Sequence, residues 1–184
     1  MKLNLGSNTH SIAGYINIDI EPLTGVDLVA DAVRLPFKSG VVDEIYAGHL
    51  LEHLSRPTDF FLECHRILVS QGQLAVVVPD ICHNNPDANI IIGVLFGFWL
   101  DDDRVPDPHT KSGMHQTCWS ADTLVSMAEY CGFEYSRVID PQNDPRLVIG
   151  ADWHTGVEFT KKELSPSVVY ANTLHKQIME NRYA

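Results

Sequence analysis

The chain has 184 residues, of which 45% are apolar and 20% are charged, and this length and balance predict one compact globular domain. Its formal net charge of -11 argues against nucleic acids and anionic membrane surfaces as partners, because no cluster of Lys or Arg offsets the repulsion. The first residues lack the features of a signal peptide and the four cysteines form no C-x-x-C pair, so we expect a cytoplasmic protein with reduced thiols.

The first half of the chain alternates short strands with turns and one clear helix. Strands are expected at 2–5, 16–18, 26–30, 44–47 and 73–78. Most of them are continuous apolar runs, as in parallel strands that are covered on both faces. Residues 57–68 start with Pro57 and place their apolar side chains on one helical face, so they predict a helix. The link at 6–15 is too short for a comfortable crossover helix, so we expect the first helix to be abbreviated to about a turn.

The second half of the chain predicts two helices and two strands. A helix is expected from the N-cap Ser120 to the stop at Gly132, followed by a strand at 134–139. A further strand is expected at 147–151, antiparallel to its neighbour because a short loop leads into it, and a terminal helix at 165–183.

These elements predict an α/β fold with an open, doubly wound, mostly parallel sheet that ends in an antiparallel strand. We expect one domain over residues 1–151, with an insertion on the acceptor side at about 81–119. Residues 152–184 would extend the same domain. The apolar run at 88–100 is too short to span a bilayer, and if exposed it would predict a homodimer.

The loop after the first strand and two carboxylates point to a nucleoside ligand. In open α/β sheets, ligands bind beyond the carboxyl ends of the strands. There, Gly6 lets the backbone approach a ligand, Asp19 can accept two hydrogen bonds from a ribose diol, and Asp31 can hold an adenine amine. Asn8 and Ser11 stand where a dinucleotide fingerprint needs glycine, so we expect a nucleoside cofactor without a pyrophosphate.

Five segments of residues 2–151 resemble small class I S-adenosylmethionine-dependent methyltransferases of the type 11-like group. They read "KLNLGSNTHSIAGYINIDI", "ADAVRLPF", "VDEIYAGHLLEH", "HRILVSQGQLAVVVPD" and "AEYCGF". The family usually has glycine where this chain has Asn8, the residue next most tolerant of a left-handed conformation.

The resemblance implies S-adenosylmethionine as cofactor and assigns residues to each part of it. The first loop would contact the methionine part, Asp19 the ribose, the segment 31–37 the adenine, and the end of the fourth strand the sulfonium and methyl group. The cofactor-binding residues would be Gly6, Ser7, Asn8, Asp19, Asp31, Ala32, Leu35, Ala47, Gly48 and His49.

The implied reaction is methyl transfer to a small-molecule or sugar acceptor, on oxygen or nitrogen, in glycan or natural-product modification. A base is needed only where the acceptor must lose a proton. His115 and His49 are the first candidates for that role, and Asp80 after the fifth strand is the third.

Other functions stay open at this point. His49 to His53 also match the H-x-x-E-H pattern of zinc proteases, in which Glu52 would activate water. A second cluster at 101–115 gathers aspartates and histidines that could hold magnesium or remove a proton. Apart from these alternatives we assign no metal ligands. A third alternative is a non-catalytic partner subunit with the methyltransferase fold.

Overall fold

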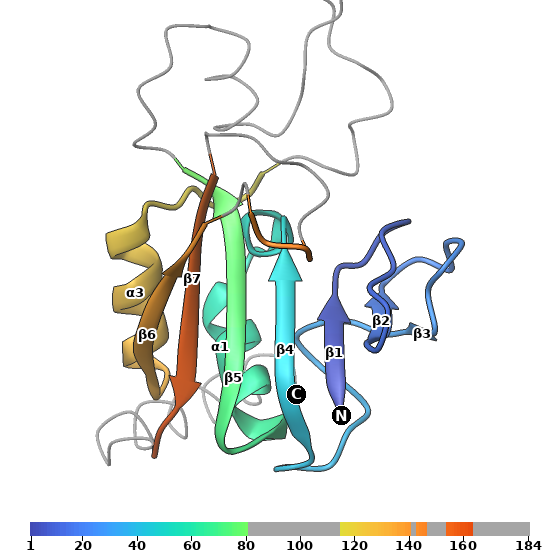
Figure 1. Ribbon diagram of the computed structural model, residues 1–184, viewed down its shortest axis with the longest axis horizontal. Coiled ribbons are helices and arrows are strands. Elements are labelled where there is room, and N and C mark those ends of the chain that lie inside the picture. The colour runs from blue at the N-terminus through green and yellow to red at the C-terminus, as the bar shows by residue number, and fades with distance from the viewer. Residues whose placement is uncertain (81–114, 141–142, 147–153, 164–184) are drawn as a thin grey trace, which may run out of the picture.

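The computed structural model of the chain describes residues 1–80, 115–140, 143–146 and 154–163 (Figure 1). The strand expected at 147–151 and the terminal helix expected at 165–183 lie outside these residues, as does most of the insertion expected at 81–119.

The described residues form seven strands, two α-helices and one short 3-10 helix. The strands are β1 (Lys2–Leu5), β2 (Ile16–Asp19), β3 (Leu28–Val29), β4 (Val42–Gly48), β5 (Leu68–Pro79), β6 (Phe133–Ile139) and β7 (His154–Lys161). The helices are η1 (Leu51–His53), α1 (Pro57–Ile67) and α3 (Ala121–Tyr130). Among these described helices, none is long and apolar enough to cross a membrane.

All seven strands belong to one sheet, in the order β3-β2-β1-β4-β5-β7-β6. The five strands from β3 to β5 in this order are parallel, and β7 runs antiparallel to both β5 and β6. The predicted fold class, a mostly parallel sheet with an antiparallel strand, is therefore confirmed.

β7 lies in the segment that we expected to be a C-terminal extension. It pairs with a neighbour on each side, so residues 154–161 are an integral part of the sheet. Of its apolar side chains, only Val157 and Phe159 alternate with polar residues and point into the core. This pattern is too short to predict a strand from the sequence.

The main hydrophobic core lies between the sheet and the two α-helices. Both α1 and α3 pack on the same face of the sheet (Figure 1). Phe60 and Phe61 of α1 and Leu124 of α3 are fully buried against side chains such as Leu74 and Phe159. Cys64 and Cys131 are buried in this core, as expected for apolar filling residues.

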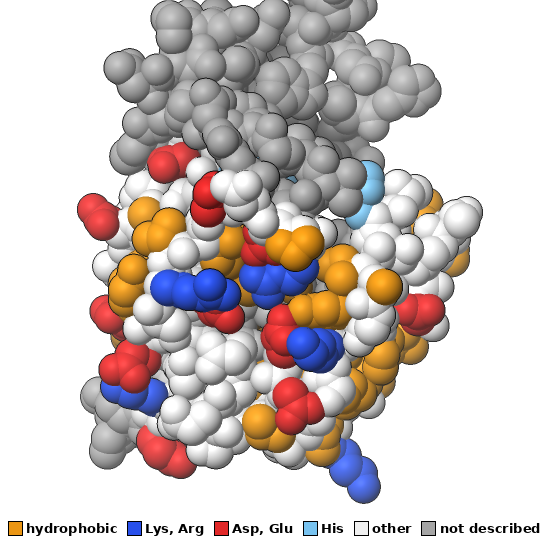
Figure 2. Space-filling view, viewed as in Figure 1, with side chains coloured by type: hydrophobic (Ala, Val, Ile, Leu, Met, Phe, Trp, Pro, Cys, Tyr) orange, Lys and Arg blue, Asp and Glu red, His pale blue; other side chains and the backbone are white. Residues whose placement is uncertain are grey.

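The opposite face of the sheet carries a smaller apolar cluster of Tyr46, Ala75, Val77 and Ile139, with charged side chains around it. In residues 1–80, all of which the structure describes, no helix precedes η1, and this confirms that the first helix is abbreviated. Charged side chains of both signs lie across this face (Figure 2). Lys2 pairs with Glu44 at 2.6 Å, and Arg137 pairs with Glu158 at 2.6 Å.

Candidate functional site

The carboxyl ends of β1, β2 and β4 lie at the same end of the sheet (Figure 1). A cavity opens there. Its volume is about 390 Å³. The predicted cofactor residues that line it are Gly6, Ser7, Asn8, Asp19, Gly48 and His49. Six of the predicted residues, distant in the sequence, are thus brought to one place, which is the position where open α/β sheets bind their ligands.

The loop after β1 has the backbone conformation that its sequence predicts. Gly6 has a φ of +67°, and a Cβ atom added there would lie 2.9 Å from Leu50 Cδ1, so only glycine fits. Asn8 has a φ of 46°, which confirms that asparagine fills a left-handed position. The Asn8 side chain oxygen accepts a hydrogen bond from the Thr9 amide at 2.7 Å, which supports the turn.

Asp19 ends β2 and is fixed by two backbone amides. Its Oδ2 accepts from the Asn8 amide at 2.8 Å and its Oδ1 accepts from the Glu21 amide at 3.0 Å. Each carboxylate oxygen keeps a further acceptor site, so Asp19 can still accept from a ligand diol. Within the described part of the chain, the buried hydroxyl of Ser7 has no hydrogen-bond partner, so it is available to a ligand in the cavity.

Tyr46 and Arg146 line the same cavity, and sequence reasoning missed both. A Cβ atom added at Gly48 would lie 2.7 Å from Tyr46 Oη, because the two residues share one face of β4. Burial raises the pKa of the Tyr46 phenol well above its usual range, so this hydroxyl stays protonated and can donate.

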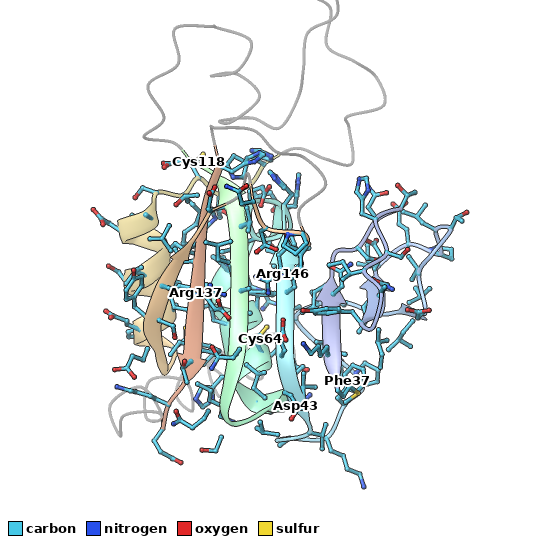
Figure 3. The ribbon with its side chains drawn as sticks, in the orientation of Figure 1. Phe37, Asp43, Cys64, Cys118, Arg137 and Arg146 are labelled. Atoms are coloured by element: carbon cyan, nitrogen blue, oxygen red, sulfur yellow. The ribbon has the colours of Figure 1, made fainter. Side chains whose placement is uncertain are left out.

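Arg146 lies over the Tyr46 ring, 5.0 Å from its centroid, beside the upper part of β4 (Figure 3). Asp144 holds the guanidinium at 2.6 Å and Glu44 holds it at 3.2 Å. Tyr46 stands two residues before Gly48, so the alternation of a strand could have predicted that both face the cavity. Nothing in the sequence predicts that Arg146 packs against β4.

Three histidines, His49, His53 and His115, lie within 4.0 Å of the buried carboxylate of Glu52, and His154 packs on one of them. His49 Nδ1 lies 3.2 Å from Glu52 Oε1, and the rings of His49 and His154 meet edge to face at 4.3 Å. The rings of His53 and His115 meet in the same way at 4.9 Å. The two predicted bases His49 and His115 therefore lie on the same carboxylate, and His49 and His53 also face the cavity.

The zinc-protease alternative requires one helix that carries both histidines of the H-x-x-E-H pattern. His49 instead has a left-handed φ of 54°, and η1 spans only Leu51–His53. Because the two histidines do not lie on one helix, we do not retain this alternative.

The remaining predicted residues do not line this cavity. Asp31 closes the turn after β3, where its side chain accepts from the Val33 amide at 3.0 Å. Leu35 and Ala47 are buried in the core, and Ala32 packs against it. Asp80 follows β5 and forms an isolated bridge with Trp119.

Comparison with known proteins agrees with this architecture. Residues 9–76 match the methyltransferase domain family. No curated protein matches the chain.

Three solved structures illustrate the similarity of fold. An S-adenosylmethionine-dependent methyltransferase from Thermotoga maritima has a TM-score of 0.62 at 17% identity, over 88% of this chain and 82% of its own. A 1,6-didemethyltoxoflavin-N1-methyltransferase from Burkholderia thailandensis, solved with S-adenosylhomocysteine, has a TM-score of 0.60 at 12% identity, over 88% of this chain and 71% of its own. A complex between the Haloferax volcanii Trm112 methyltransferase activator and a methyltransferase has a TM-score of 0.57 at 14% identity, over 88% of this chain and 82% of its own.

The solved structures share the fold, and the sequence match begins directly after Asn8 and covers Asp19 and the end of β4. The chain therefore has the fold of the class I methyltransferases, and residues 9–76 match the methyltransferase domain family.

Proposed function

We propose that the chain transfers the methyl group of S-adenosylmethionine to an oxygen or nitrogen atom of a small molecule or sugar. The observation that supports this proposal is the cavity at the ends of β1, β2 and β4, which joins six of the predicted cofactor residues. The cytoplasm stays the predicted location, and glycan or natural-product modification the predicted setting.

The residues of the cavity fit the parts of the cofactor. The anchored Asp19 carboxylate would accept hydrogen bonds from the ribose diol, and the Ser7 hydroxyl would bond the methionine part beside Gly6 and Asn8. Asp31 lies outside this cavity, in the turn after β3, and stays the predicted contact of the adenine. When bound, the cofactor supplies a methyl group that is already activated by its sulfonium.

The protein has two further tasks in such a reaction. It must hold the acceptor at near-attack distance and exclude water, and it must remove a proton if the acceptor is a hydroxyl. His49 lines the cavity and contacts Glu52, so we propose it as the base, with His115 on the same carboxylate as the second candidate. Asp80 is the third.

Formation of S-adenosylhomocysteine from S-adenosylmethionine in the presence of acceptor pools tests this proposal. Fractions of small hydroxyl and amine compounds would be supplied to the purified chain, and product would be measured by mass spectrometry. We expect turnover with one chemical class, and at least a hundredfold lower kcat in His49→Gln if the acceptor is a hydroxyl. His65→Gln, which changes a histidine on α1, should leave kcat unchanged. Cofactor binding without turnover on any fraction would contradict the enzyme proposal.

A second candidate is a partner subunit with the methyltransferase fold. One of the similar solved structures is a complex with a methyltransferase activator, and this favours a search for a bound partner. A stable complex that co-purifies with the tagged chain, together with turnover only in that complex, would support this candidate over the free enzyme.

A further inference from the structure

We propose that Glu52, His53 and His115 bind a divalent transition-metal ion beside the cofactor cavity. One carboxylate oxygen and two imidazole nitrogens of these residues lie within 4.8 Å of one another. Glu52 Oε1 lies 3.9 Å from His53 Nε2 and 4.0 Å from His115 Nε2. With metal bonds of about 2.0–2.2 Å, two ligands of one ion lie roughly 3–4 Å apart, so small side-chain shifts suffice.

The burial of Glu52 is the second observation that points to a cation. This residue is only 1% exposed, although ionised carboxylates are rarely buried without a partner. Among the described residues, Glu52 Oε2 is buried and has no hydrogen-bond partner. A bound cation would compensate the buried carboxylate at the position where the two imidazoles already point.

Backbone hydrogen bonds fix the two ligand segments to each other independently of the ligand side chains. The Glu52 carbonyl accepts from the amides of Gln116 at 2.7 Å and Thr117 at 3.1 Å. The Gln116 side chain donates to the His53 carbonyl at 2.8 Å, and the Thr117 hydroxyl donates to the Leu51 carbonyl at 3.1 Å. The segment that follows His115 is therefore held on η1, as a preformed metal site requires.

The donor set selects the kind of ion. Two imidazoles and one carboxylate suit borderline ions such as Zn²⁺ or Fe²⁺, whereas Mg²⁺ and Ca²⁺ prefer oxygen ligands alone. Three protein ligands also leave at least one coordination position open, as in catalytic metal sites. His49 Nδ1, 3.2 Å from Glu52 Oε1, can orient the carboxylate.

The position of the site predicts the substrate class, and this step rests on the proposed methyl transfer. His53 lines the cofactor cavity, so an open metal position would face the place where the acceptor binds. A hydroxyl bound to the ion would ionise more readily: its O–H bond breaks, the electron pair stays on oxygen, and the proton passes to water. We therefore expect an acceptor with a hydroxyl that can ligate a metal.

Titration of the chelator-treated full chain with Zn²⁺ in a calorimeter tests the site without any cofactor. We expect one ion per chain with a dissociation constant of micromolar or lower, and a higher melting temperature with zinc. Glu52→Gln should weaken binding at least tenfold. His53→Gln changes a side chain that is 30% exposed, so it keeps the test valid if the buried Glu52 variant fails to fold. His65→Gln, outside the cluster, is the matched control and should bind zinc normally.

The outcomes separate this inference from the proposed function. A folded chain that binds S-adenosylhomocysteine but no zinc, or that binds zinc equally in Glu52→Gln and His53→Gln, would overturn the metal site alone. Zinc binding that is lost in both variants, in a chain that binds no S-adenosylhomocysteine, would support the metal site and overturn the proposed methyl transfer.

Discussion

At the scale of single residues, the cavity depends on backbone conformations that few side chains tolerate. Gly6, Asn8 and His49 all have positive φ values and all line the cavity. Such conformations cost free energy in residues other than glycine and concentrate at functional sites. The left-handed backbone at Asn8 and His49 lowers stability, so we infer that it is kept because the shape of the cavity requires it.

Gly6→Ala should destabilise the protein more than Gly40→Ala, although both glycines have a φ of +67°. An added Cβ atom lies 2.9 Å from Leu50 Cδ1 at Gly6 but meets nothing within 4 Å at Gly40. We expect a loss of about 1 kcal/mol at Gly40 from the backbone alone, and about 2–4 kcal/mol at Gly6, where overpacking adds to it. Urea unfolding monitored by circular dichroism measures both, and equal losses would contradict the close packing of Leu50.

At the scale of elements, the start of α3 is stabilised by the N-cap that its sequence predicts. The Ser120 hydroxyl accepts from the Thr123 amide at 3.3 Å, and the Thr123 hydroxyl accepts from the Ser120 amide at 2.9 Å. This reciprocal cap satisfies two amides at the start of the helix. The N-cap that the sequence predicts at Ser120 is confirmed.

Removal of the cap by Ser120→Ala should lower the free energy of unfolding by about 1 kcal/mol. Ser126→Ala, at an exposed position within the same helix, is the matched control and should be neutral or slightly stabilising, because alanine has the higher helix propensity. Thermal unfolding of both variants gives the comparison. A Ser120→Ala protein as stable as Ser126→Ala would show that the cap contributes nothing.

Two carboxylates beside the sheet, Asp144 and Glu44, predict a dependence of stability on pH. Burial tends to raise the pKa of Asp144, but hydrogen bonds from Arg146 outweigh it, so the pKa lies below its ordinary value. Burial also tends to raise the pKa of Glu44, but hydrogen bonds from Lys2 and Tyr15 outweigh this effect, so the pKa of Glu44 is lowered overall. A pKa that is depressed by folding stabilises the native state above the unfolded pKa, and this stability is lost as the pH falls through the folded value.

We therefore expect the free energy of unfolding to fall as the pH drops below roughly 4, where the unfolded carboxyls begin to take up protons. Asp144→Asn should lower it at pH 7 by on the order of 1 kcal/mol after solvent screening, and should make the fall in acid shallower. Glu129→Gln removes an exposed carboxyl on α3 and serves as the control. Urea unfolding at several pH values tests this, and an unchanged acid slope in Asp144→Asn would contradict it.

At the scale of the whole molecule, the fold class and six residues of the cavity could be predicted from the sequence. The predicted strand at 2–5 and helix at 57–68 agree with β1 and α1 to within a residue, because apolar runs and Pro57 mark their limits. β7 could not be predicted, since its burial depends on strands on both sides. The same holds for the contacts of Arg146 with Tyr46 and of His115 with Glu52, which join distant segments.

The central claim is that the cavity at the ends of β1, β2 and β4 binds the cofactor through Asp19. The most direct test is calorimetric titration of the chelator-treated chain with S-adenosylhomocysteine, with Asp19→Ala in parallel. Asp43→Ala is the matched control, because Asp43 lies at the opposite end of β4 (Figure 3). We predict micromolar binding that is at least tenfold weaker in Asp19→Ala and unchanged in Asp43→Ala. A folded chain that binds no S-adenosylhomocysteine, or binds it equally well without the Asp19 carboxylate, would contradict the account.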